Sequence, residues 1–298
     1  MFVSLKILFE SPYNKAHPIK AIYRFVYWKF IRFLNIKNQK IRFWGNNYFL
    51  INYDSFQSMW LMYNYIVDWE EFNFIHNYIS KDSIVFDIGS NMGFYSIWMG
   101  RSLGPTGELH IFEPDQKSFV RLKKNISINS LQAKVKLNQK AVSTESGLGK
   151  ITMGLDGENH LITDKSTIDI IGDIELVSLD QYINDNQLSE IDFIKIDVEG
   201  FELNVLKGAL LSLRKNKIGV IQLEINATIS NAGVNRTEII DFVHENGYHF
   251  YRYDISKNML FPVDLTSERE NYFISAEVDK VNSTLNLNKK WKTAIMSL

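Results

Sequence analysis

Apolar and polar positions follow two alternating periods over most of the chain after residue 82. Short apolar runs typical of buried strands lie at residues 83–88, 108–113, 134–138, 191–196 and 218–225. Between these runs, apolar residues recur at the spacing of a helix, for example at Leu203, Leu206, Leu210 and Leu213. Strands that alternate with helices predict a doubly wound α/β sheet, mostly parallel, which collects ligands at the carboxyl ends of its strands.

Other patterns flank or interrupt this alternation. Residues 40–55 alternate as a hairpin would, with Gly45-Asn46-Asn47 at the turn, and residues 56–80 have helical character. The glycine-rich stretch 143–177 breaks the strand–helix rhythm. We expect an inserted hairpin there, on the substrate side of the sheet.

The C-terminal region supplies the last elements of the sheet. A helix at about 236–246 and strands at 248–253 and 271–275 predict a final antiparallel pair. We therefore divide the chain into three parts: a basic, aromatic-rich extension with helical and hairpin segments over residues 1–80, a main α/β domain over 81–280, and a polar tail over 281–298.

Charge is distributed unevenly along the chain. The formal net charge is −1, yet residues 1–43 contain nine Lys or Arg and one acidic residue, Glu10. Aromatic residues are interleaved with the basic ones from Lys15 to Arg42. This composition is typical of a surface that docks on anionic lipid or on a membrane-bound partner. An alternative is a helical cap whose aromatic rings pack on the main domain while its lysines are solvated, and both interpretations stay open.

The composition excludes several classes of protein. With 45% apolar and 13% aromatic residues, the chain can bury a sizeable core, so disorder is not expected. The absence of cysteine rules out disulfides, thiolate metal sites and a cysteine nucleophile. Lys6 and Glu10 interrupt the apolar N-terminal stretch, so we expect no signal peptide, and no run approaches the roughly 20 apolar residues that span a bilayer. A cytoplasmic protein is therefore expected, with peripheral membrane attachment as an option.

A glycine-rich loop, Asp87-Ile88-Gly89-Ser90-Asn91-Met92-Gly93-Phe94, follows the first strand of the main domain. Dinucleotide folds have G-x-G-x-x-G there, and their second glycine lets the backbone approach a pyrophosphate. Here Asn91 takes the second position and Gly93 comes one residue early, so a pyrophosphate would be crowded. S-adenosylmethionine has no phosphate and fits. We predict that it contacts Asp87, Gly89, Ser90, Asn91 and Gly93.

An acidic residue follows the next predicted strand. Glu113 comes 20 residues after Gly93, in His110-Ile111-Phe112-Glu113-Pro114. A carboxylate at this position can accept hydrogen bonds from both hydroxyls of a ribose, as it does in nicotinamide enzymes. Glu113 therefore predicts a nucleoside cofactor without naming it. The alternative is that Glu113 only caps the following helix.

Further carboxylates follow the strands at 191–196 and 218–225. If the first of these strands continues through Asp197 and Glu199, their side chains share one face. Glu224, with Asn226 nearby, ends the next strand. Such a cluster can act as a general base for a hydroxyl or hold a divalent cation, so the metal question stays open. Glu202 is better explained as a first-turn acid favoured by the helix dipole.

These motifs together resemble the FkbM family of S-adenosylmethionine-dependent methyltransferases. The resemblance runs from about residue 60 to 275, and its most distinctive part is Lys195-Ile196-Asp197-Val198-Glu199-Gly200-Phe201-Glu202 with Lys207-Gly208-Ala209. It implies a class I methyltransferase sheet with an antiparallel C-terminal strand, and methyl transfer to oxygen. By the resemblance, the loop residues and Glu113 hold the cofactor, and Asp197 and Glu199 lie beside the methyl group or the acceptor.

The leading hypothesis is O-methylation of a hydroxyl, on a sugar of a surface polysaccharide or lipid-linked glycan. Glu199, Glu224 or Asp197 is the candidate base. An alternative acceptor is a natural product or another small molecule. An alternative of another class is a non-catalytic partner in glycan assembly, which residues 1–43 could contact. Nicotinamide chemistry conflicts with the glycine spacing, and an acidic main domain disfavours a nucleic-acid substrate. The sequence does not indicate an oligomeric state.

Overall fold

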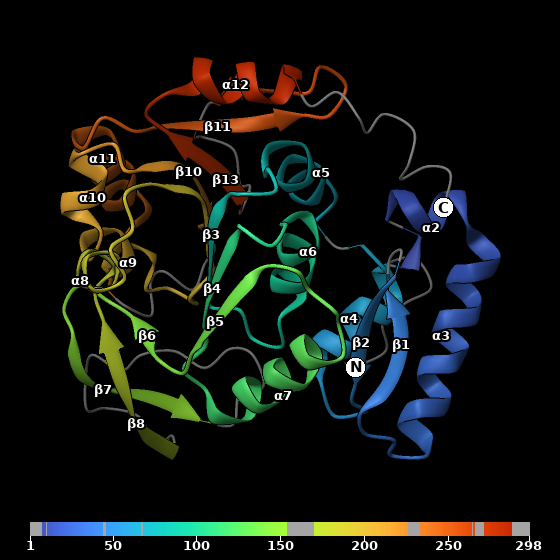
Figure 1. Cartoon of the computed structure of the whole chain (residues 1–298). Helices are drawn as coiled ribbons and strands as arrows, with labels where there is room; N and C mark the ends of the chain where they lie inside the picture. Colours follow the sequence, from blue (N-terminus) through green and yellow to red (C-terminus); the bar gives the residue numbers. More distant parts are fainter. Residues whose placement is uncertain are drawn as a thin grey trace.

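A mostly parallel sheet forms the centre of the protein in the computed structural model, which describes residues 8–9, 11–43, 46–66, 68–153, 170–225, 233–263, 265 and 271–287. Within these residues, eight strands lie in the order β12-β11-β13-β10-β9-β3-β4-β5 (Figure 1). Five neighbours are parallel: β5 (Lys134–Asn138), β4 (Glu108–Phe112), β3 (Ile84–Ile88), β9 (Ile191–Ile196) and β10 (Ile218–Glu224). The apolar runs of the sequence predicted all five.

The C-terminal strands complete the sheet in the antiparallel sense. β13 (Asn271–Ser275) pairs with β10, and β11 (His249–Asp254) pairs with β13, so the last strand of the chain lies inside the sheet. The predicted antiparallel pair is confirmed, and β12 (Met259–Pro262) adds an unpredicted edge strand on β11. The helix α12 (Val278–Leu287) lies along this end, where Asn258 donates from Nδ2 to the carbonyl of Leu285.

The order of the parallel strands determines where a ligand can bind. β3 is the first strand of the sheet in the sequence and lies between β4, which follows it, and β9, which comes much later. The chain therefore reverses its winding direction beside β3. In open α/β sheets, ligands bind at such a point, beyond the carboxyl ends of the strands. This arrangement confirms the predicted doubly wound, class I methyltransferase sheet.

Helices cover both faces of the sheet (Figure 1). The first face packs against α5 (Trp69–Tyr78), α6 (Phe94–Ser102) and α7 (Gln116–Ser127), and buries residues such as Phe74 and Ile97. The second face packs against α8 (Leu179–Asp185), α9 (Glu202–Lys207), α10 (Leu210–Arg214) and α11 (Arg236–Glu245), which contribute Leu203, Leu206 and Leu213. The elements α9 and α10 replace the single helix that the leucine spacing predicted.

A close backbone approach accompanies the break between α9 and α10. A Cβ atom on Gly208 would lie 2.1 Å from the carbonyl oxygen of Ser143. Only glycine allows that contact, and the chain turns at Gly208 before α10 begins. The break therefore follows from packing against a distant loop, which helical periodicity does not reveal.

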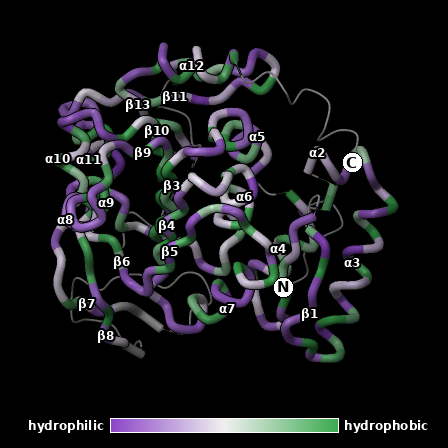
Figure 2. The backbone as a smooth tube through the Cα atoms, in the orientation of Figure 1, coloured by the Kyte–Doolittle hydropathy of each residue, from purple (hydrophilic) through white to green (hydrophobic). Residues whose placement is uncertain are grey.

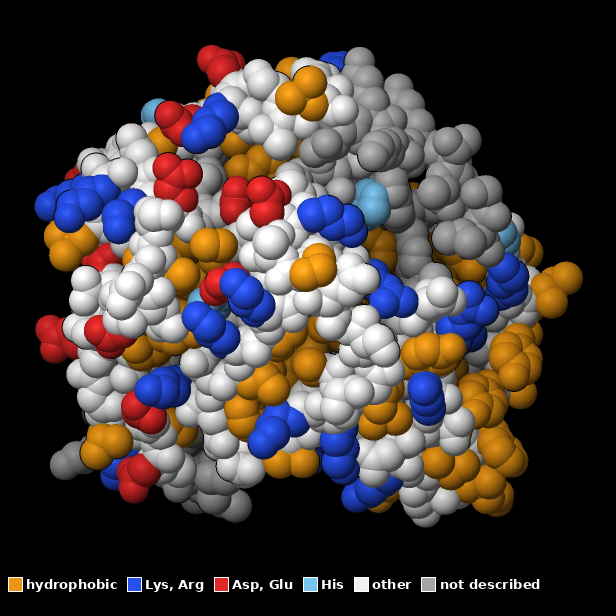
Figure 3. All heavy atoms as spheres, viewed as in Figure 1, with side chains coloured by type: hydrophobic (Ala, Val, Ile, Leu, Met, Phe, Trp, Pro, Cys, Tyr) orange, Lys and Arg blue, Asp and Glu red, His pale blue; other side chains and the backbone are white. Residues whose placement is uncertain are grey.

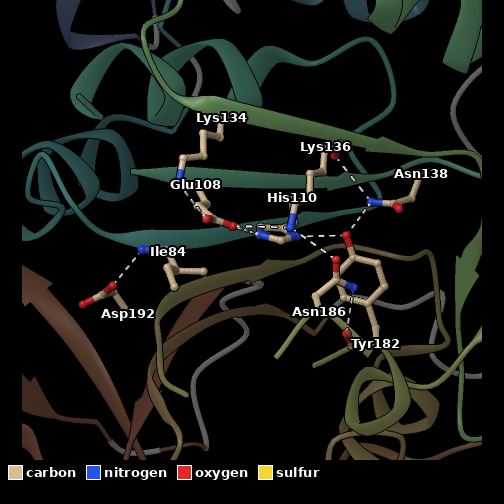
Figure 4. Close-up of polar contacts among 9 residues, drawn as sticks. All are labelled: Ile84, Glu108, His110, Lys134, Lys136, Asn138, Tyr182, Asn186 and Asp192. Carbon is tan, nitrogen blue, oxygen red and sulfur yellow. Dashed lines mark hydrogen bonds and ion pairs between the residues drawn. The ribbon is translucent and has the colours of Figure 1, made fainter. Parts of the chain in front are cut away.

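A buried polar network joins β4, β5 and α8 on the second face of the sheet (Figure 4). The His110 ring lies between Glu108, whose Oε2 is 3.2 Å from Nε2, and Tyr182, whose hydroxyl is 2.9 Å from Nδ1. Asn138 donates to the same hydroxyl at 3.2 Å. Burial, together with the charge of Lys136, lowers the pKa of His110 to about 4. The imidazole is therefore neutral near pH 7, as its surroundings require.

The predicted hairpin near residue 150 is present as β7 (Gly147–Met153) and β8 (Ile170–Val177). β8 also pairs in parallel with β6 (Ala141–Val142), which gives a small three-stranded sheet beside the main one. Ala141 and Val142 line the first cavity, which is described below. This part of the prediction is confirmed for the strands, whereas residues 154–169 lie outside the described part of the chain.

The N-terminal segment forms a layer outside α6 and α7. It contains α2 (Pro12–Ala16), α3 (Pro18–Phe33), the hairpin of β1 (Gln39–Phe43) and β2 (Asn47–Ile51), and α4 (Phe56–Asn64), as the hairpin and helical patterns predicted. Side chains of α7 and of the turn after it bind backbone amides of β2. Asn125 accepts a hydrogen bond from the amide of Leu50, and Asn129 accepts one from the amide of Tyr48, each at 2.8 Å. No helix in the described ranges has the length and apolar character to cross a bilayer.

Candidate active site

The glycine loop folds tightly at the carboxyl end of β3. Gly89, Asn91 and Gly93 have φ values of +77°, +49° and +87°. Glycine adopts this left-handed conformation freely, and Asn is among the few other residues that tolerate it. The amides of Gly89 and Ser90 both donate to the carbonyl of Phe112, at 3.0 and 3.1 Å, so the loop is tied to the end of β4.

Close packing explains why Gly89 and Gly93 carry no side chain. A Cβ atom on Gly89 would lie 1.7 Å from the carbonyl oxygen of Asp197, and one on Gly93 would lie 2.6 Å from Leu122. Gly93 is the residue before α6, so the loop passes directly into that helix. The turn after β9 therefore touches the glycine loop, although more than 100 residues separate them in the sequence.

Glu113 clamps the glycine loop from the neighbouring strand. Its Oε2 accepts from the amide of Asn91 at 2.7 Å, and its Oε1 accepts from the amide of Asp115 at 2.9 Å. Asp115, whose side chain accepts from the amide of Ser118, is the residue that caps α7. The capping alternative for Glu113 is therefore wrong. Burial raises the pKa of Glu113 to about 7, although both amides favour its charged form.

A first cavity opens between the glycine loop and the residues after β4. Glu113, Asp115 and Ser118 line its polar side, and Phe112, Pro114, Val142 and Phe201 line its apolar side. The cavity is open to solvent on one side, and its empty volume, with that opening included, is about 700 Å³. Carboxylate and hydroxyl groups on one side with apolar walls on the other suit a nucleoside.

A buried ammonium joins the glycine loop to the turn after β9. The Nζ atom of Lys195 lies 2.7 Å from Oδ2 of Asp197 and 3.3 Å from the carbonyl oxygen of Gly89. It also lies 5.0 Å from the centre of the Tyr95 ring. Burial opposes the charge of Lys195, but the carboxylates of Asp197 and Asp87 outweigh burial, and the pKa is raised.

Asp87 lies beneath the loop instead of in a cavity. It is fully buried within β3 and accepts a short hydrogen bond from the hydroxyl of Ser96. Its Oδ1 has no hydrogen-bond partner among the described residues. Burial raises its pKa, and Lys195 partly opposes that shift. Contact between Asp87 and a cofactor stays a prediction, since Asp87 and Gly93 line neither cavity described here.

The strand β9 ends at Ile196, as the apolar run predicted, so the condition under which Asp197 and Glu199 would share one face of the strand is not met. Glu199 has φ of +52° and Gly200 has φ of +103°, which turn the chain instead. A non-glycine residue in this region is strained and is found most often at functional sites. Glu202 supports the turn: its Oε1 accepts from the amides of Gly200 at 3.1 Å and Val198 at 3.3 Å.

A second cavity opens on the other side of the glycine loop. Its polar lining includes Asp68, Ser90, Lys195, Glu224 and Asn271, and its aromatic lining includes Phe56, Trp60, Phe94 and Tyr95. The rings of Phe56 and Trp60 are stacked, with centroids 5.9 Å apart. The Tyr95 hydroxyl donates to Asp68 at 2.7 Å and accepts from Gln222 at 3.1 Å, which holds this ring in place.

The two cavities meet along one wall. Both are lined by Gln57, Gly89, Asn91, Asp197 and Glu199. A group bound in the first cavity can therefore reach a group bound in the second beside these residues. Glu224 lies on the second cavity only. The structure thus brings the carboxylates at the ends of β9 and β10 together with the glycine loop, as the parallel sheet predicted.

Several residues that line the two cavities were not predicted from the sequence. Lys195 had a signal, because it is a charged residue between two isoleucines of an apolar strand, and such a residue is buried only with a partner. Trp60 and Tyr95 line the second cavity, whereas the nearby Tyr63 and Trp98 are buried in the core, and no sequence pattern separates the two pairs. Gln57, Asp68 and Asn271 carry no local pattern that marks them. Asn226 lies outside the described residues.

The site does not present a ready-made metal centre. Across the described ranges, no three His, Asp or Glu side chains are grouped so that they could hold an ion. A divalent cation therefore enters none of the steps proposed below.

The strand order defines a sheet of the class I methyltransferase type, and the two cavities lie at the carboxyl edge of its strands. The family model described as "Methyltransferase FkbM domain" matches residues 87–250, which include the loop, Glu113 and the carboxylates after β9 and β10. The chain belongs to this FkbM methyltransferase family.

Two curated relatives share part of this domain. Methyltransferase sdnD of Sordaria araneosa is 28% identical over 160 residues, which cover 44% of this chain and 61% of that protein. The hexuronic acid methyltransferase AglP of Haloferax volcanii is 25% identical over 161 residues, which cover 52% of this chain and 61% of that protein. The chain thus spans about three fifths of the length of these relatives.

Solved methyltransferases are among the structures that resemble this chain at low scores. An rRNA methylase from Streptococcus thermophilus has a TM-score of 0.39 at 11% identity, covering 68% of this chain and 91% of that one. The precorrin-6y C5,15-methyltransferase from Geobacter metallireducens has a TM-score of 0.38 at 13% identity, covering 69% and 84%. These scores are low, and the fold class follows from the strand order itself.

Proposed function

We propose that this chain is an S-adenosylmethionine-dependent O-methyltransferase that acts on a hydroxyl of a sugar, in a surface polysaccharide or a lipid-linked glycan. The observation that carries the proposal is the wall shared by the two cavities, where Asp197 and Glu199 lie between the cavity that Glu113 lines and the aromatic-lined one. Membership of the FkbM family supports the reaction type.

The first cavity suits the nucleoside part of the cofactor. Glu113 keeps acceptor capacity for ribose hydroxyls, because each carboxylate oxygen has more than one lone pair and only one amide is bound to each. The buried Ser90 hydroxyl, which has no hydrogen-bond partner in the described part of the chain, belongs to the lining of the second cavity. When bound, the cofactor supplies a methyl group already activated for transfer.

The second cavity suits a sugar. A sugar ring has apolar C–H faces and polar edges, and the stacked rings of Phe56 and Trp60 provide an apolar surface beside the carboxylate of Glu224 and the amide of Asn271. The sheet pairs Glu224 directly with Asn271, so their backbones fix the distance between these two polar groups. The name of the relative AglP, a hexuronic acid methyltransferase, is consistent with this acceptor class.

Glu199 is the proposed general base. It lies on the shared wall, whereas Glu224 lines only the second cavity and one oxygen of Asp197 is already bound to the Lys195 ammonium. Glu199 has a positive φ in the turn after β9, and such strained positions cluster at functional sites. The chain then does two things: the walls align the hydroxyl with the methyl group, and Glu199 accepts the hydroxyl proton.

A small-molecule hydroxyl of the natural-product type is the second candidate acceptor. The second cavity is lined by the aromatic side chains of Phe56, Trp60, Phe94 and Tyr95, which would bind the apolar rings of such a compound. Methyltransferase sdnD is a relative over part of this domain. A non-catalytic role in glycan assembly is disfavoured, because a scaffold would not need a carboxylate on the shared wall.

The test is transfer of labelled methyl groups from S-adenosylmethionine to a panel of nucleotide sugars, lipid-linked sugars, isolated glycans and aromatic natural products. We expect label on a sugar hydroxyl. Transfer to carbon or nitrogen, or binding of S-adenosylhomocysteine without any transfer, would overturn the proposal. Thermal shift with S-adenosylhomocysteine and with NADH separates methyl transfer from nicotinamide chemistry.

The role of Glu199 is tested separately. Glu199→Gln should lower turnover by about 10²- to 10⁴-fold, the usual contribution of a general base, and leave the Kd for S-adenosylhomocysteine nearly unchanged. Glu190→Gln is the matched control, since Glu190 is exposed and precedes the opposite end of β9. Equal turnover in the two variants would exclude Glu199 as the base.

A further inference from the structure

The helix α3 presents an apolar face to solvent. Six large apolar side chains on it are between 48% and 82% exposed: Ile19, Ile22, Tyr23, Val26, Phe30 and Phe33. At 100° per residue these positions fall within one arc of about 100°, so they form a single stripe along the helix. In Figure 2 the apolar residues recur along the whole of α3, at the outer edge of the molecule.

A different face of α3 anchors the helix to the protein. Ala21, Trp28 and Ile31 are fully buried. The Phe25 ring stacks on Tyr63 of α4 at 5.3 Å, and Arg24 donates to the carbonyl of Met62 at 3.3 Å. The alternative in which all the aromatic rings of this segment pack on the main domain is therefore wrong for Tyr23, Phe30 and Phe33. Folding does not require these side chains, so their exposure points to a partner.

Positive charge borders this apolar stripe. Lys20 flanks one side of it and Lys29 the other, with Arg32 beyond, and all three are exposed. Residues 11–43 contain eight Lys or Arg and no acidic residue. Figure 3 shows the basic and hydrophobic side chains gathered together over the part of the surface where α3 lies. An apolar stripe between cations is the pattern of a helix that lies in the interface of an anionic bilayer.

We propose that α3 docks this protein on anionic phospholipid, with the helix parallel to the membrane surface. The charges favour lipid over a second copy of the chain. A pair of copies joined through this stripe would bring Lys20, Lys29 and Arg32 against the same cations of the partner, and like charges at an interface are repelled. Phospholipid headgroups supply the complementary charge, and the acyl region receives Phe30 and Phe33.

Docking through α3 would place the second cavity close to the membrane. The helix α4 packs on the inner side of α3, and its residues Phe56, Gln57, Trp60 and Leu61 line that cavity. One helix therefore separates the proposed lipid surface from the proposed acceptor site. This geometry suits an acceptor carried on a lipid. Lipid binding itself requires no methyl transfer, so it can succeed or fail independently of the proposed reaction.

The test is flotation of the full chain with vesicles of phosphatidylcholine containing about one third phosphatidylglycerol, compared with vesicles of phosphatidylcholine alone. We expect binding to the anionic vesicles, at least about tenfold weaker binding to the neutral ones, and weakening as salt screens the charges. The double variant Phe30→Ser/Phe33→Ser should lower the bound fraction at least about tenfold. Lys20→Gln/Lys29→Gln should weaken binding to anionic vesicles and remove most of its salt dependence.

Leu148→Ser is the matched control, because Leu148 is 85% exposed on β7, which is far from α3 in the fold. It should bind vesicles as the wild type does. Light scattering on the same samples reports the oligomeric state. The proposal is overturned if the wild type binds neither kind of vesicle. It is also overturned if Phe30→Ser/Phe33→Ser binds as well as Leu148→Ser, or if this double variant converts a dimer to a monomer without changing vesicle binding.

Discussion

The Nζ atom of Lys195 lies 2.7 Å from Oδ2 of Asp197, and the same atom lies 3.3 Å from the carbonyl oxygen of Gly89. One ammonium thus holds the turn after β9 against the glycine loop after β3. The carboxylate of Asp87, which is buried beneath the loop, also favours the charged form of Lys195. The wall between the two cavities is built on this contact.

Lys195→Met should lower the free energy of unfolding by about 3–5 kcal/mol, because it leaves the buried carboxylate of Asp87, and the partly exposed carboxylate of Asp197, without their cation. Urea unfolding near neutral pH measures the change. Lys134→Met is the control: Lys134 is 62% exposed and pairs with Glu108 at the surface, so we expect a loss below about 1 kcal/mol. Equal losses in the two variants would show that the Lys195 pair is not a buried one in solution.

Binding of S-adenosylhomocysteine should weaken as the pH falls through about 7. Burial raises the pKa of Glu113 to about 7, and the ribose hydroxyls donate better to its charged form. Affinity should therefore level off above this pH and fall by up to about tenfold per pH unit below it. Isothermal titration at several pH values measures the slope. Glu113→Gln should bind weakly with a flat profile, whereas Glu145→Gln, at an exposed site, should keep the wild-type slope.

Gly89→Ala should be more damaging than Gly247→Ala, although the two residues have similar φ values of +77° and +81°. Both variants strain the backbone, by about 1–2 kcal/mol. Only the first also places a Cβ atom 1.7 Å from the carbonyl oxygen of Asp197, while Gly247 faces open space. We expect a further loss of about 1–3 kcal/mol for Gly89→Ala, together with loss of cofactor binding. Thermal unfolding and titration test this, and equal effects would contradict the close approach.

The buried His110 should make the protein less stable as the pH falls from about 6.5 to about 4. Its pKa is lowered to about 4 in the folded state, so the unfolded state binds more protons over this range. The loss should reach about 3 kcal/mol. Glu113 and Glu202 have pKa values raised to about 7 and act in the opposite sense over about pH 4.5–7.

The difference between wild type and His110→Gln therefore isolates this histidine from those carboxylates. The variant should be less stable near pH 7 through its altered contacts with Glu108 and Tyr182, but its stability should fall less on acidification. Urea unfolding at a series of pH values gives both curves. Parallel curves would mean that His110 is not held neutral by the fold.

Most of the sheet could be predicted because buried parallel strands are continuous apolar runs. The runs at 83–88 and 191–196 correspond to β3 and β9. The structure differs from the predicted elements where contacts between distant segments outweigh the local pattern of residues. The leucine stripe continues past Gly208, but the helix breaks there against Ser143. The predicted end of β9 at residue 196 is confirmed, but the turn after it was not predicted, because positive φ at Glu199 leaves no trace in hydrophobic periodicity.

The sequence predicted individual residues of the candidate site, but it did not predict the two cavities that they line. The glycine loop, Glu113 and the carboxylates after β9 and β10 are local patterns at strand ends, and parallel strands bring such ends to one edge. Trp60 and Tyr95 come from outside that edge. They reach the second cavity through the packing of α4 and α6, which depends on contacts between segments far apart in the chain.

The sequence by itself determined the fold class, the FkbM resemblance and the cofactor type expected of the loop, because each depends on short-range spacing of residues along a strand and the turn after it. The tertiary structure alone decided three further matters. It placed Glu199 on a wall shared by two cavities, since that position depends on the turn against Gly89. It paired Lys195 with Asp197. It also determined that Tyr23, Phe30 and Phe33 are exposed. The helix α3 has apolar residues on two sides, and its packing against α4 selects the side that is buried.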